Sequence, residues 1–425
     1  MSPKNAIGAD VAGVDWTGTE LELELGAPGH GGFCVARHEG RVVFVRHGLP
    51  GERVRALVTE DRGGSFCRAD AVDVLVASAD RVPSRCPVSG PGGCGGCDFQ
   101  HVALPAQRVM KASVVAEQLR RLGGVEYEAA DITVEELPGA PDGLGWRSRV
   151  RMAVAPDGSV GFHRHRSTDV VPVLGCPQTV PHALDGVVGA VWNPGSELQV
   201  VRDGAGEQHV VELRPDPRPQ RGRRKARPVP HTVIGSGKAT EQAVGRSWRV
   251  SATGFWQGHI GAAEVYAQAV ADFAQAPMGG TAWDLYGGAG LFAAVLAEQV
   301  GTGGSVVAVE SSRTSVADGM AALADLAQVS FVAAQVEQHL RLLPTPVDVV
   351  VLDPPRSGAG RPVVEGIVAA EPKRIVYVAC DPAALGRDVA LFAGHGYRMN
   401  ALRAFDAFPM THHVECIALF EPDAH

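Results

Sequence analysis

A chain of 425 residues is too long for one ordinary hydrophobic core, so we expect two or three domains. The formal net charge of −8, with basic residues that are mostly arginine, gives no overall signature of nucleic-acid binding and leaves only local basic surfaces for such a partner. No apolar run approaches membrane-spanning length and the N-terminal residues lack the layout of a signal peptide, so we expect a cytoplasmic protein without a membrane partner.

Residues 20–80 predict a small β-barrel that follows a polar, mobile segment at residues 1–19. Turns at Pro28-Gly29 and Gly63-Gly64 separate short alternating runs of apolar residues. The expected strands are Leu21–Leu25, Phe33–His38, Arg41–Arg46, Arg53–Glu60 and Phe66–Val76.

The run Gly40-Arg-Val-Val-Phe-Val-Arg-His-Gly-Leu-Pro-Gly-Glu52 resembles the TRAM domain, an OB-like barrel of RNA-modifying enzymes. A small β-barrel without RNA-binding function fits the same strands. Barrels of the OB type bind nucleic acid through local basic and aromatic groups rather than through net charge. The candidate contacts are Arg37, Arg46, Arg53 and Arg55.

Three cysteines, Cys86, Cys94 and Cys97, cluster in a glycine-rich segment. The glycines allow tight folding while the thiolates converge on one centre, and soft sulfur ligands select zinc or an iron–sulfur cluster. The next cysteine, Cys176, follows a strand-like segment and can supply a fourth ligand. Because we expect a cytoplasmic chain, this spacing indicates a metal site rather than disulfides, and from the residues alone zinc and cluster remain equally open.

The central region, residues 81–245, is expected to be rich in β-strands around these cysteines. Its helical segment, Gln107–Gly124, has an apolar stripe and is expected to pack on the C-terminal domain. The later segment Arg214–Lys238 lacks apolar periodicity and predicts a flexible loop. Its arginines either contact RNA phosphates or remain solvated.

Two arginine-rich runs in the central region predict an RNA-facing sheet. In the first, the strand period places three arginines on one face after Trp146. Cations interleaved with aromatic rings favour phosphate contact and base stacking over two solvated edge strands. The predicted contacts are Trp146, Arg147, Arg149 and Arg151 in the first run and Phe162, His163, Arg164, His165 and Arg166 in the second.

Residues 246–425 alternate apolar strands with alanine-rich helices, which predicts a doubly wound α/β domain. Helix Ala262–Ala274 precedes a strand that ends in Asp284 and the turn Gly288-Ala-Gly290, where backbone can approach a ligand closely. The next strand ends in Glu310, at the offset where a ribose hydroxyl is usually held. Two glycines in the turn, rather than three, favour S-adenosylmethionine over a dinucleotide.

Further strand ends direct reactive side chains into the same crevice. Strand Val347–Leu352 precedes Asp353-Pro-Pro-Arg356, whose prolines stiffen the loop. Strand Ile375–Ala379 precedes Cys380, and Glu415 begins the last strand. Alone, Cys380 also fits a buried structural cysteine, and Glu415 a surface glutamate. If they are adjacent, they form a nucleophile and a general base.

The chain resembles the RNA uracil-5 methyltransferases over almost its whole length. The motifs that carry the resemblance are Gly254-Phe-Trp-Gln257, Asp284-Leu-Tyr-Gly-Gly-Ala-Gly290, Asp353-Pro-Pro-Arg356, Ala379-Cys-Asp-Pro382 and Phe408-Pro-Met-Thr-His-His-Val-Glu415. The resemblance implies an α/β fold, in which a Rossmann-like class I methyltransferase domain follows an N-terminal OB-like β-barrel and a central β-rich iron–sulfur domain. The implied ligands of S-adenosylmethionine are Gln257, Tyr286, Gly288, Gly290, Glu310 and Asp353.

The resemblance also implies methyl transfer to carbon 5 of a uridine, with Cys380 adding to carbon 6 and Glu415 removing the carbon-5 proton. The cysteines resemble those of the ribosomal-RNA branch rather than the tRNA branch. In that branch four cysteines hold a four-iron four-sulfur cluster, and the matching positions are Cys86, Cys94, Cys97 and Cys176. We expect a monomer that acts on ribosomal RNA.

Three positions depart from the family pattern. Gly287 stands where the family usually has cysteine, and Ala379 and Asp381 replace the usual serine and asparagine around Cys380. Asp381 adds a negative charge beside Cys380, which is expected to raise the pKa of its thiol. Two other functions remain compatible with the sequence: an RNA amino-methyltransferase that uses the Asp353-Pro-Pro loop without a thiol, and a non-catalytic iron–sulfur protein that binds RNA.

Overall fold

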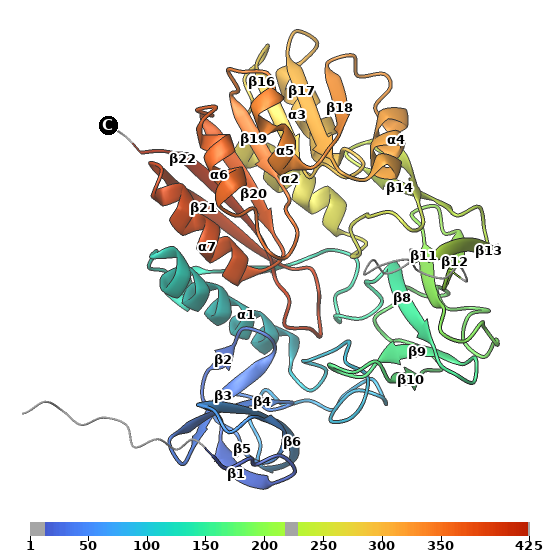
Figure 1. Ribbon diagram of the computed structural model, residues 1–425, viewed down its shortest axis with the longest axis vertical. Helices are drawn as coiled ribbons and strands as arrows, with labels where there is room; N and C mark the ends of the chain where they lie inside the picture. The colour runs from blue at the N-terminus through green and yellow to red at the C-terminus, as the bar shows by residue number, and fades with distance from the viewer. Residues whose placement is uncertain (1–12, 217–227, 424–425) are drawn as a thin grey trace, which may run out of the picture.

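The computed structural model of the protein describes residues 13–216 and 228–423, so the prediction for residues 1–12 lies outside the described residues. The protein consists of a small barrel, a middle β-sheet region and a larger α/β domain, with helix α1 (Leu104–Gln118) between the barrel and the α/β domain (Figure 1). No helix in the described ranges is long and apolar enough to cross a membrane.

The N-terminal barrel forms from the predicted strands, whose alternating apolar residues are buried. Its strand order is β1-β5-β6-β4-β3-β2. The strands are β1 (Glu20–Glu24), β2 (Pro28–Gly29), β3 (Phe33–His38), β4 (Arg41–Arg46), β5 (Arg53–Asp61) and β6 (Phe66–Val76). Trp16 is buried in this barrel, with the Arg41 guanidinium 4.1 Å from its ring centroid. The barrel therefore begins before residue 20.

The middle region folds around an antiparallel sheet ordered β10-β9-β8-β11-β12-β13. Its strands are β8 (Arg149–Val154), β9 (Val160–His163), β10 (Val170–Pro172), β11 (Glu197–Arg202), β12 (Gln208–Arg214) and β13 (Val229–Ile234). The prediction of a loop over Arg214–Lys238 is wrong for β13, whose backbone pairs with β12 although most of its side chains are exposed. Residues 217–227 of that segment lie outside the described ranges.

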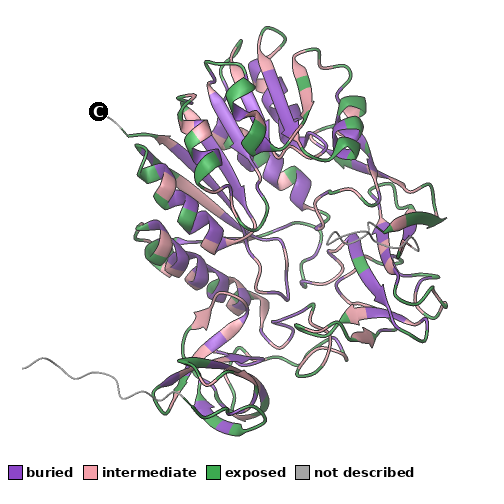
Figure 2. Ribbon diagram, viewed as in Figure 1, coloured by how far each residue is buried: buried purple, intermediate pink, exposed green. Residues whose placement is uncertain are grey.

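The α/β domain is built on an eight-stranded sheet ordered β18-β17-β16-β19-β20-β22-β21-β7. The apolar runs of the sequence form its central parallel strands, which are buried on both faces (Figure 2). The strands are β7 (Val134–Glu136), β16 (Thr281–Leu285), β17 (Ser305–Glu310), β18 (Val329–Ala333), β19 (Val349–Leu352), β20 (Arg374–Ala379), β21 (Tyr397–Asp406) and β22 (Glu415–Pro422).

Helices cover both faces of this sheet, as expected for a doubly wound domain (Figure 1). They are α2 (Ala262–Ala274), α3 (Leu291–Val300), α4 (Arg313–Ala322), α5 (Val336–His339), α6 (Arg361–Val368) and α7 (Pro382–Ala393). The hairpin of β14 (Lys238–Ala243) and β15 (Arg246–Ser251) packs against α4. The domain therefore includes residues before 246.

Helix α1 and strand β7 come from the middle of the chain but complete the α/β domain. A π-helical turn (Leu119–Gly123) extends α1, and Leu119 shares a hydrophobic core with Val389 of α7. Lys111 Nζ donates a hydrogen bond to Asp406 Oδ1 at 2.5 Å, and both side chains are buried. Strand β7 pairs in parallel with β21 at the sheet edge.

Candidate active site and cysteine cluster

The predicted site residues gather at the edge of the eight-stranded sheet where its parallel strands end. Glu310 ends β17, Asp353 follows β19 and Cys380 follows β20. Glu415 joins this edge because β22 runs antiparallel to β20 and begins there. In open α/β sheets this edge is where ligands bind.

The turn after β16 is shaped by Asp284, whose side chain is fully buried. Its Oδ2 accepts a hydrogen bond from the Ala293 amide at 2.9 Å, whereas its Oδ1 has no partner among the described residues. A Cβ atom at Gly287, where the resemblance leads us to expect cysteine, would lie 2.8 Å from Oδ2, so the turn packs closely on this carboxyl group. Burial raises the pKa of Asp284 to about 8, and the carboxyl groups of Asp353 and Glu310 contribute to the shift.

The glycine turn is tied to the end of β17. Gly288 and Gly290 have positive φ angles of 55° and 82°, and the Gly288 amide donates a hydrogen bond to Glu310 Oε2 at 3.1 Å. Tyr286 also has a positive φ of 61°, which is uncommon for a bulky residue, and its hydroxyl donates to Glu337 Oε1 at 3.1 Å. The structure thus places the Glu310 carboxylate directly against the turn.

Gln257 lies in the loop before α2 and is half-buried. Its neighbour Trp256 packs against Trp248 with ring centroids 5.3 Å apart. Trp248 Nε1 in turn donates a hydrogen bond to the carbonyl of Ala289, between the two turn glycines, at 2.9 Å. The loop that carries Gln257 is therefore packed against the glycine turn.

The pairing of β20 with β22 brings Cys380 beside Glu415. Ala379 and Cys416 are Cα partners, so Cys380 and Glu415 occupy the next positions of the two strands. Cys380 is half-buried and Glu415 is buried. Arg356 extends toward the loop before Glu415, with its Nη2 3.2 Å from His413 Nε2.

The electrostatic environment favours the protonated forms of Cys380, Asp353 and Glu415. Burial, followed by the carboxyl groups of Glu415 and Asp353, raises the pKa of the Cys380 thiol to about 12, while the Arg356 guanidinium opposes the shift. Asp381 raises this pKa further, in the predicted direction. Burial raises the pKa of Asp353 to about 7, and burial with Asp353 raises the pKa of Glu415 well above its usual value. A positively charged ligand here would favour the ionised forms.

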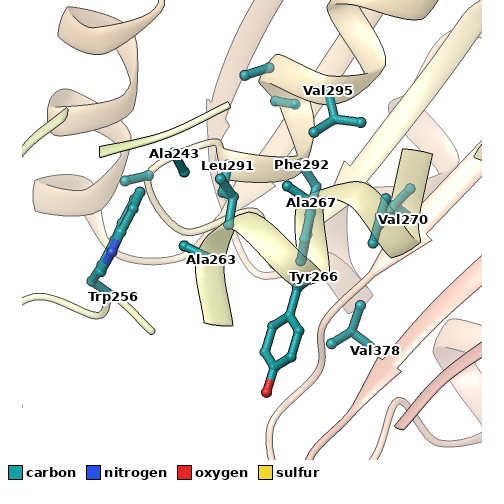
Figure 3. Packing of buried hydrophobic residues seen from close by; sticks show 14 of the residues in the cluster. Ala243, Trp256, Ala263, Tyr266, Ala267, Val270, Leu291, Phe292, Val295 and Val378 are labelled. Carbon is teal, nitrogen blue, oxygen red and sulfur yellow. The ribbon is translucent and has the colours of Figure 1, made fainter. Parts of the chain in front are cut away.

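Tyr266, which none of the motifs includes, belongs to the same group of side chains. Its ring packs against Phe405 with centroids 5.5 Å apart, and Phe405 is the Cα partner of Glu415. Figure 3 shows the Tyr266 hydroxyl pointing away from the apolar side chains around α2 and α3. This hydroxyl is buried and has no partner among the described residues. Burial, Glu415 and Asp353 raise its pKa well above the usual value. The signal in the sequence that could have indicated Tyr266 was a tyrosine on the apolar face of an alanine-rich helix.

The four predicted metal ligands, Cys86, Cys94, Cys97 and Cys176, line one pocket, and none of them forms a disulfide. The sulfurs also receive hydrogen bonds: the Gly96 amide lies 3.4 Å from Cys94 Sγ, and Gln100 Nε2 lies 3.6 Å from Cys97 Sγ. All four cysteines lie within the described residues, and Arg147 and Gln178 line the same pocket. The structure therefore brings the four predicted ligands to one place.

A groove of about 1060 Å³ runs between the barrel and the cysteine segment. Its walls combine basic and aromatic side chains, including Phe33, Phe44, Arg68, Arg164, His165 and Arg166. Arg164, His165 and Arg166 are exposed, as predicted for RNA contacts. Arg68 was not predicted, although its position on a barrel strand made it a candidate.

Three of the other predicted RNA contacts of the central region, Trp146, Arg147 and Arg149, need correction, whereas Arg151 and His163 are exposed. Arg147 precedes β8 and points into the cysteine pocket, while Arg149 is buried and donates to Glu241 Oε1 at 2.8 Å. Trp146 is buried against His259, with ring centroids 5.7 Å apart, so it cannot stack on a base. The prediction failed because the strand begins at Arg149, three residues after Trp146, and because Glu241 of β14 covers the Arg149 side chain.

Most of the predicted barrel arginines are also engaged within the protein. Arg46 is buried and donates to Asp98 Oδ1 at 3.1 Å. Arg53 and Arg55 form exposed ion pairs with Glu22 and Glu20 at 3.3 and 3.8 Å. Exposed pairs of this kind are weak, so Arg53 and Arg55 keep access to solvent, whereas Arg46 does not.

Comparison with known families gives two matches. Residues 255–422 match the family described as tRNA (uracil-5-)-methyltransferase, and residues 16–72 match the TRAM domain. A Streptomyces avermitilis protein named an uncharacterized RNA methyltransferase is 43% identical over 96% of this chain and 99% of its own length. A Shewanella baltica protein named 23S rRNA (uracil(1939)-C(5))-methyltransferase RlmD is 30% identical over 95% of this chain and 96% of its own length.

Among solved structures, the fold is similar to that of a Pyrococcus abyssi tRNA (uracil-54, C5)-methyltransferase in complex with S-adenosyl-L-homocysteine. The TM-score is 0.68 at 21% identity, over 94% of this chain and all of that chain. At this identity the likeness supports the fold, and the assignment of residues must come from the geometry described above.

Proposed function

The chain belongs to the RNA uracil-5 methyltransferase family, and from this we propose that it methylates carbon 5 of a uridine in RNA with S-adenosylmethionine as methyl donor. The observation that carries the proposal is the convergence of Cys380 and Glu415 at the ends of β20 and β22, beside Asp353 and Arg356. An amino-methyltransferase has no use for a thiol in this position.

We infer that Gln257, Tyr286, Gly288, Gly290, Glu310 and Asp353 hold S-adenosylmethionine. The tight glycine turn and the Glu310 carboxylate beside it fit an adenosyl ribose. Bound there, S-adenosylmethionine supplies an electrophilic methyl group. Its positive charge also suits this site, because Glu415 is buried near Asp353 and the Arg356 guanidinium only partly offsets the rise in the pKa of Glu415.

In the proposed mechanism, the thiolate of Cys380 adds to carbon 6 of uracil, and the new bond makes carbon 5 nucleophilic. Once carbon 5 carries the methyl group, Glu415 removes its proton, and the carbon–sulfur bond breaks to release Cys380. Asp353 and Arg356 are placed to orient the base and to stabilise charge on its oxygens. The pKa of the Cys380 thiol is about 12 in the free protein. Formation of the thiolate therefore requires that bound substrate and the positively charged methyl donor lower this pKa.

We propose that the RNA follows the groove between the barrel and the cysteine segment. Exposed arginines there can contact phosphates, and Phe33 and Phe44 can stack on unpaired bases. A target base must leave its stack to enter the site at the sheet edge. The relative named for position 1939 of 23S rRNA favours ribosomal RNA as the substrate.

The test of the reaction is nucleoside analysis of in vitro transcribed 23S ribosomal RNA after incubation with protein and S-adenosylmethionine. We expect 5-methyluridine with the wild-type protein and with Cys416→Ala, whose thiol is buried next to the site but faces the core. Cys380→Ala should lower the rate of product formation by a factor of at least about 10⁴, because it removes the nucleophile. Methylation of an amino group that survives Cys380→Ala would contradict the proposal.

We further propose that Cys86, Cys94, Cys97 and Cys176 hold a four-iron four-sulfur cluster. The four thiols line one pocket, soft sulfur ligands select zinc or an iron–sulfur cluster, and the resemblance to the ribosomal-RNA branch favours the cluster. Protein purified without oxygen should contain about four iron and four sulfide per chain. Cys97→Ser should lose this content, and Cys67→Ser, a buried barrel cysteine, should keep it. Stoichiometric zinc without sulfide would refute the cluster.

A further inference from the structure

His30 of the barrel directly contacts Asp381 of the α/β domain. The distance from His30 Nε2 to Asp381 Oδ2 is 3.0 Å, across a separation of 351 positions in the sequence. Asp381 immediately follows Cys380, and both contacting side chains are partly shielded from solvent, at 35% and 23% exposure. The barrel therefore reaches the turn that carries the proposed nucleophile.

Asp381 also fixes the start of the helix behind Cys380. Its Oδ1 accepts a hydrogen bond from the Ala384 amide at 2.8 Å, which makes Asp381 the N-cap of α7. Burial acts to raise the pKa of Asp381, but the hydrogen bonds from His30 and from the helix amide lower it below its usual value. One carboxylate therefore connects the barrel to the first turn of α7.

The loop that carries His30 is held in place from a second side. The His30 ring lies edge-on to His412 with centroids 6.5 Å apart, and His412 Nδ1 lies 2.5 Å from Asp98 Oδ2. At Gly32 a Cβ atom would lie 2.8 Å from Asp98 Cγ, and its φ of +80° also requires glycine. The loop therefore packs closely on Asp98, and its position relative to the segment before Glu415 is fixed.

The same His30 side chain lines the groove proposed for RNA. A nucleotide bound in the groove would therefore reach the imidazole that contacts the carboxylate of Asp381. We propose that His30 is a positioning residue, which transmits the binding of RNA in the groove to the turn that carries Cys380. This inference rests on the proposed role of Cys380 as nucleophile.

The test measures single-turnover adduct formation on 23S ribosomal RNA transcribed with 5-fluorouridine, together with the Kd for that RNA. His30→Ala should slow adduct formation about tenfold, the upper range for one lost hydrogen bond, and should change Kd less than about twofold. His30→Gln can still donate to Asp381 and should restore most of the rate. Asp381→Ser keeps a capping hydroxyl but is too short to reach His30, so it should resemble His30→Ala.

The double variant His30→Ala/Asp381→Ser should be no slower than the slower single variant, because both remove one contact. The control is His182→Ala, which removes another histidine–aspartate pair, exposed, with His182 Nδ1 2.9 Å from Asp185 Oδ2. It should change neither measurement. Independent, multiplicative losses in the double variant would overturn the proposal, as would a His30→Ala effect confined to Kd or a His30→Gln protein as slow as His30→Ala.

A second readout separates this proposal from the proposed function. If wild-type protein forms no adduct, the mechanism at Cys380 fails, and the positioning is then measured by the rate at which iodoacetamide alkylates Cys380 in the free protein. His30→Ala should change that rate several-fold, within the effect of one hydrogen bond. His182→Ala should leave it as in wild type. Equal rates for wild type and His30→Ala would contradict the contact between His30 and the turn.

Discussion

Asp284 illustrates how a single buried carboxyl group makes the stability of the free protein depend on pH. Below about pH 4 it is protonated in both the folded and the unfolded chain and costs no stability. Its pKa in the folded protein is about 8, so between pH 4 and pH 8 the folded state binds the proton that the unfolded chain has lost. The free energy of unfolding therefore falls as the pH rises through this range.

Asp284→Asn should remove this pH dependence while it keeps an acceptor for the Ala293 amide. We expect the variant to match wild type at pH 4 and to become progressively more stable than wild type up to pH 8, with no further gain above. Each pKa unit corresponds to about 1.4 kcal/mol, so the gain is several kcal/mol at most. Urea denaturation of the ligand-free proteins at several pH values measures it. Parallel pH profiles would contradict the burial of this charge.

At the scale of elements, local patterns in the sequence predicted the helices and strands whose bounds follow from the burial of their own side chains. Helix Ala262–Ala274 has the bounds predicted for it, and the strand before Cys380 differs by one residue. Strand β13 was missed because it is held by backbone pairing while its side chains face solvent. The burial of Arg149 was missed because its partner, Glu241, lies in the hairpin of β14 and β15, which no local pattern connects to β8.

The attachment of α1 to the α/β domain depends on the buried pair of Lys111 and Asp406. Lys111→Met should lower the free energy of unfolding by about 3–5 kcal/mol, because it leaves the Asp406 carboxylate buried without a partner. The double variant Lys111→Met/Asp406→Leu should recover most of this loss, since an apolar pair of similar volume is well tolerated there. Denaturant unfolding measures both. A single variant as stable as wild type would show that the pair is solvated.

At the scale of the whole molecule, all three parts meet at the loop before Glu415. Asp98, next to Cys97, contacts His412, and Gln178, two residues after Cys176, donates to the carbonyl of Pro409 at 3.2 Å. The cysteine segment therefore supports the loop that leads to the proposed base. The motifs predicted that Cys380 and Glu415 act together, but these supporting contacts join residues hundreds of positions apart, so no spacing in the sequence could indicate them.

The central claim is that Cys380 joins covalently to the uracil ring. RNA that contains 5-fluorouridine tests it directly. Fluorine takes the place of the carbon-5 proton that the base would remove, so the carbon–sulfur bond cannot break and the adduct persists. After incubation with this RNA and S-adenosylmethionine, digestion and mass spectrometry should find a methylated fluorouridine adduct on the peptide that contains Cys380. The absence of an adduct under conditions where unmodified RNA is methylated, or an adduct on another cysteine, would contradict the account.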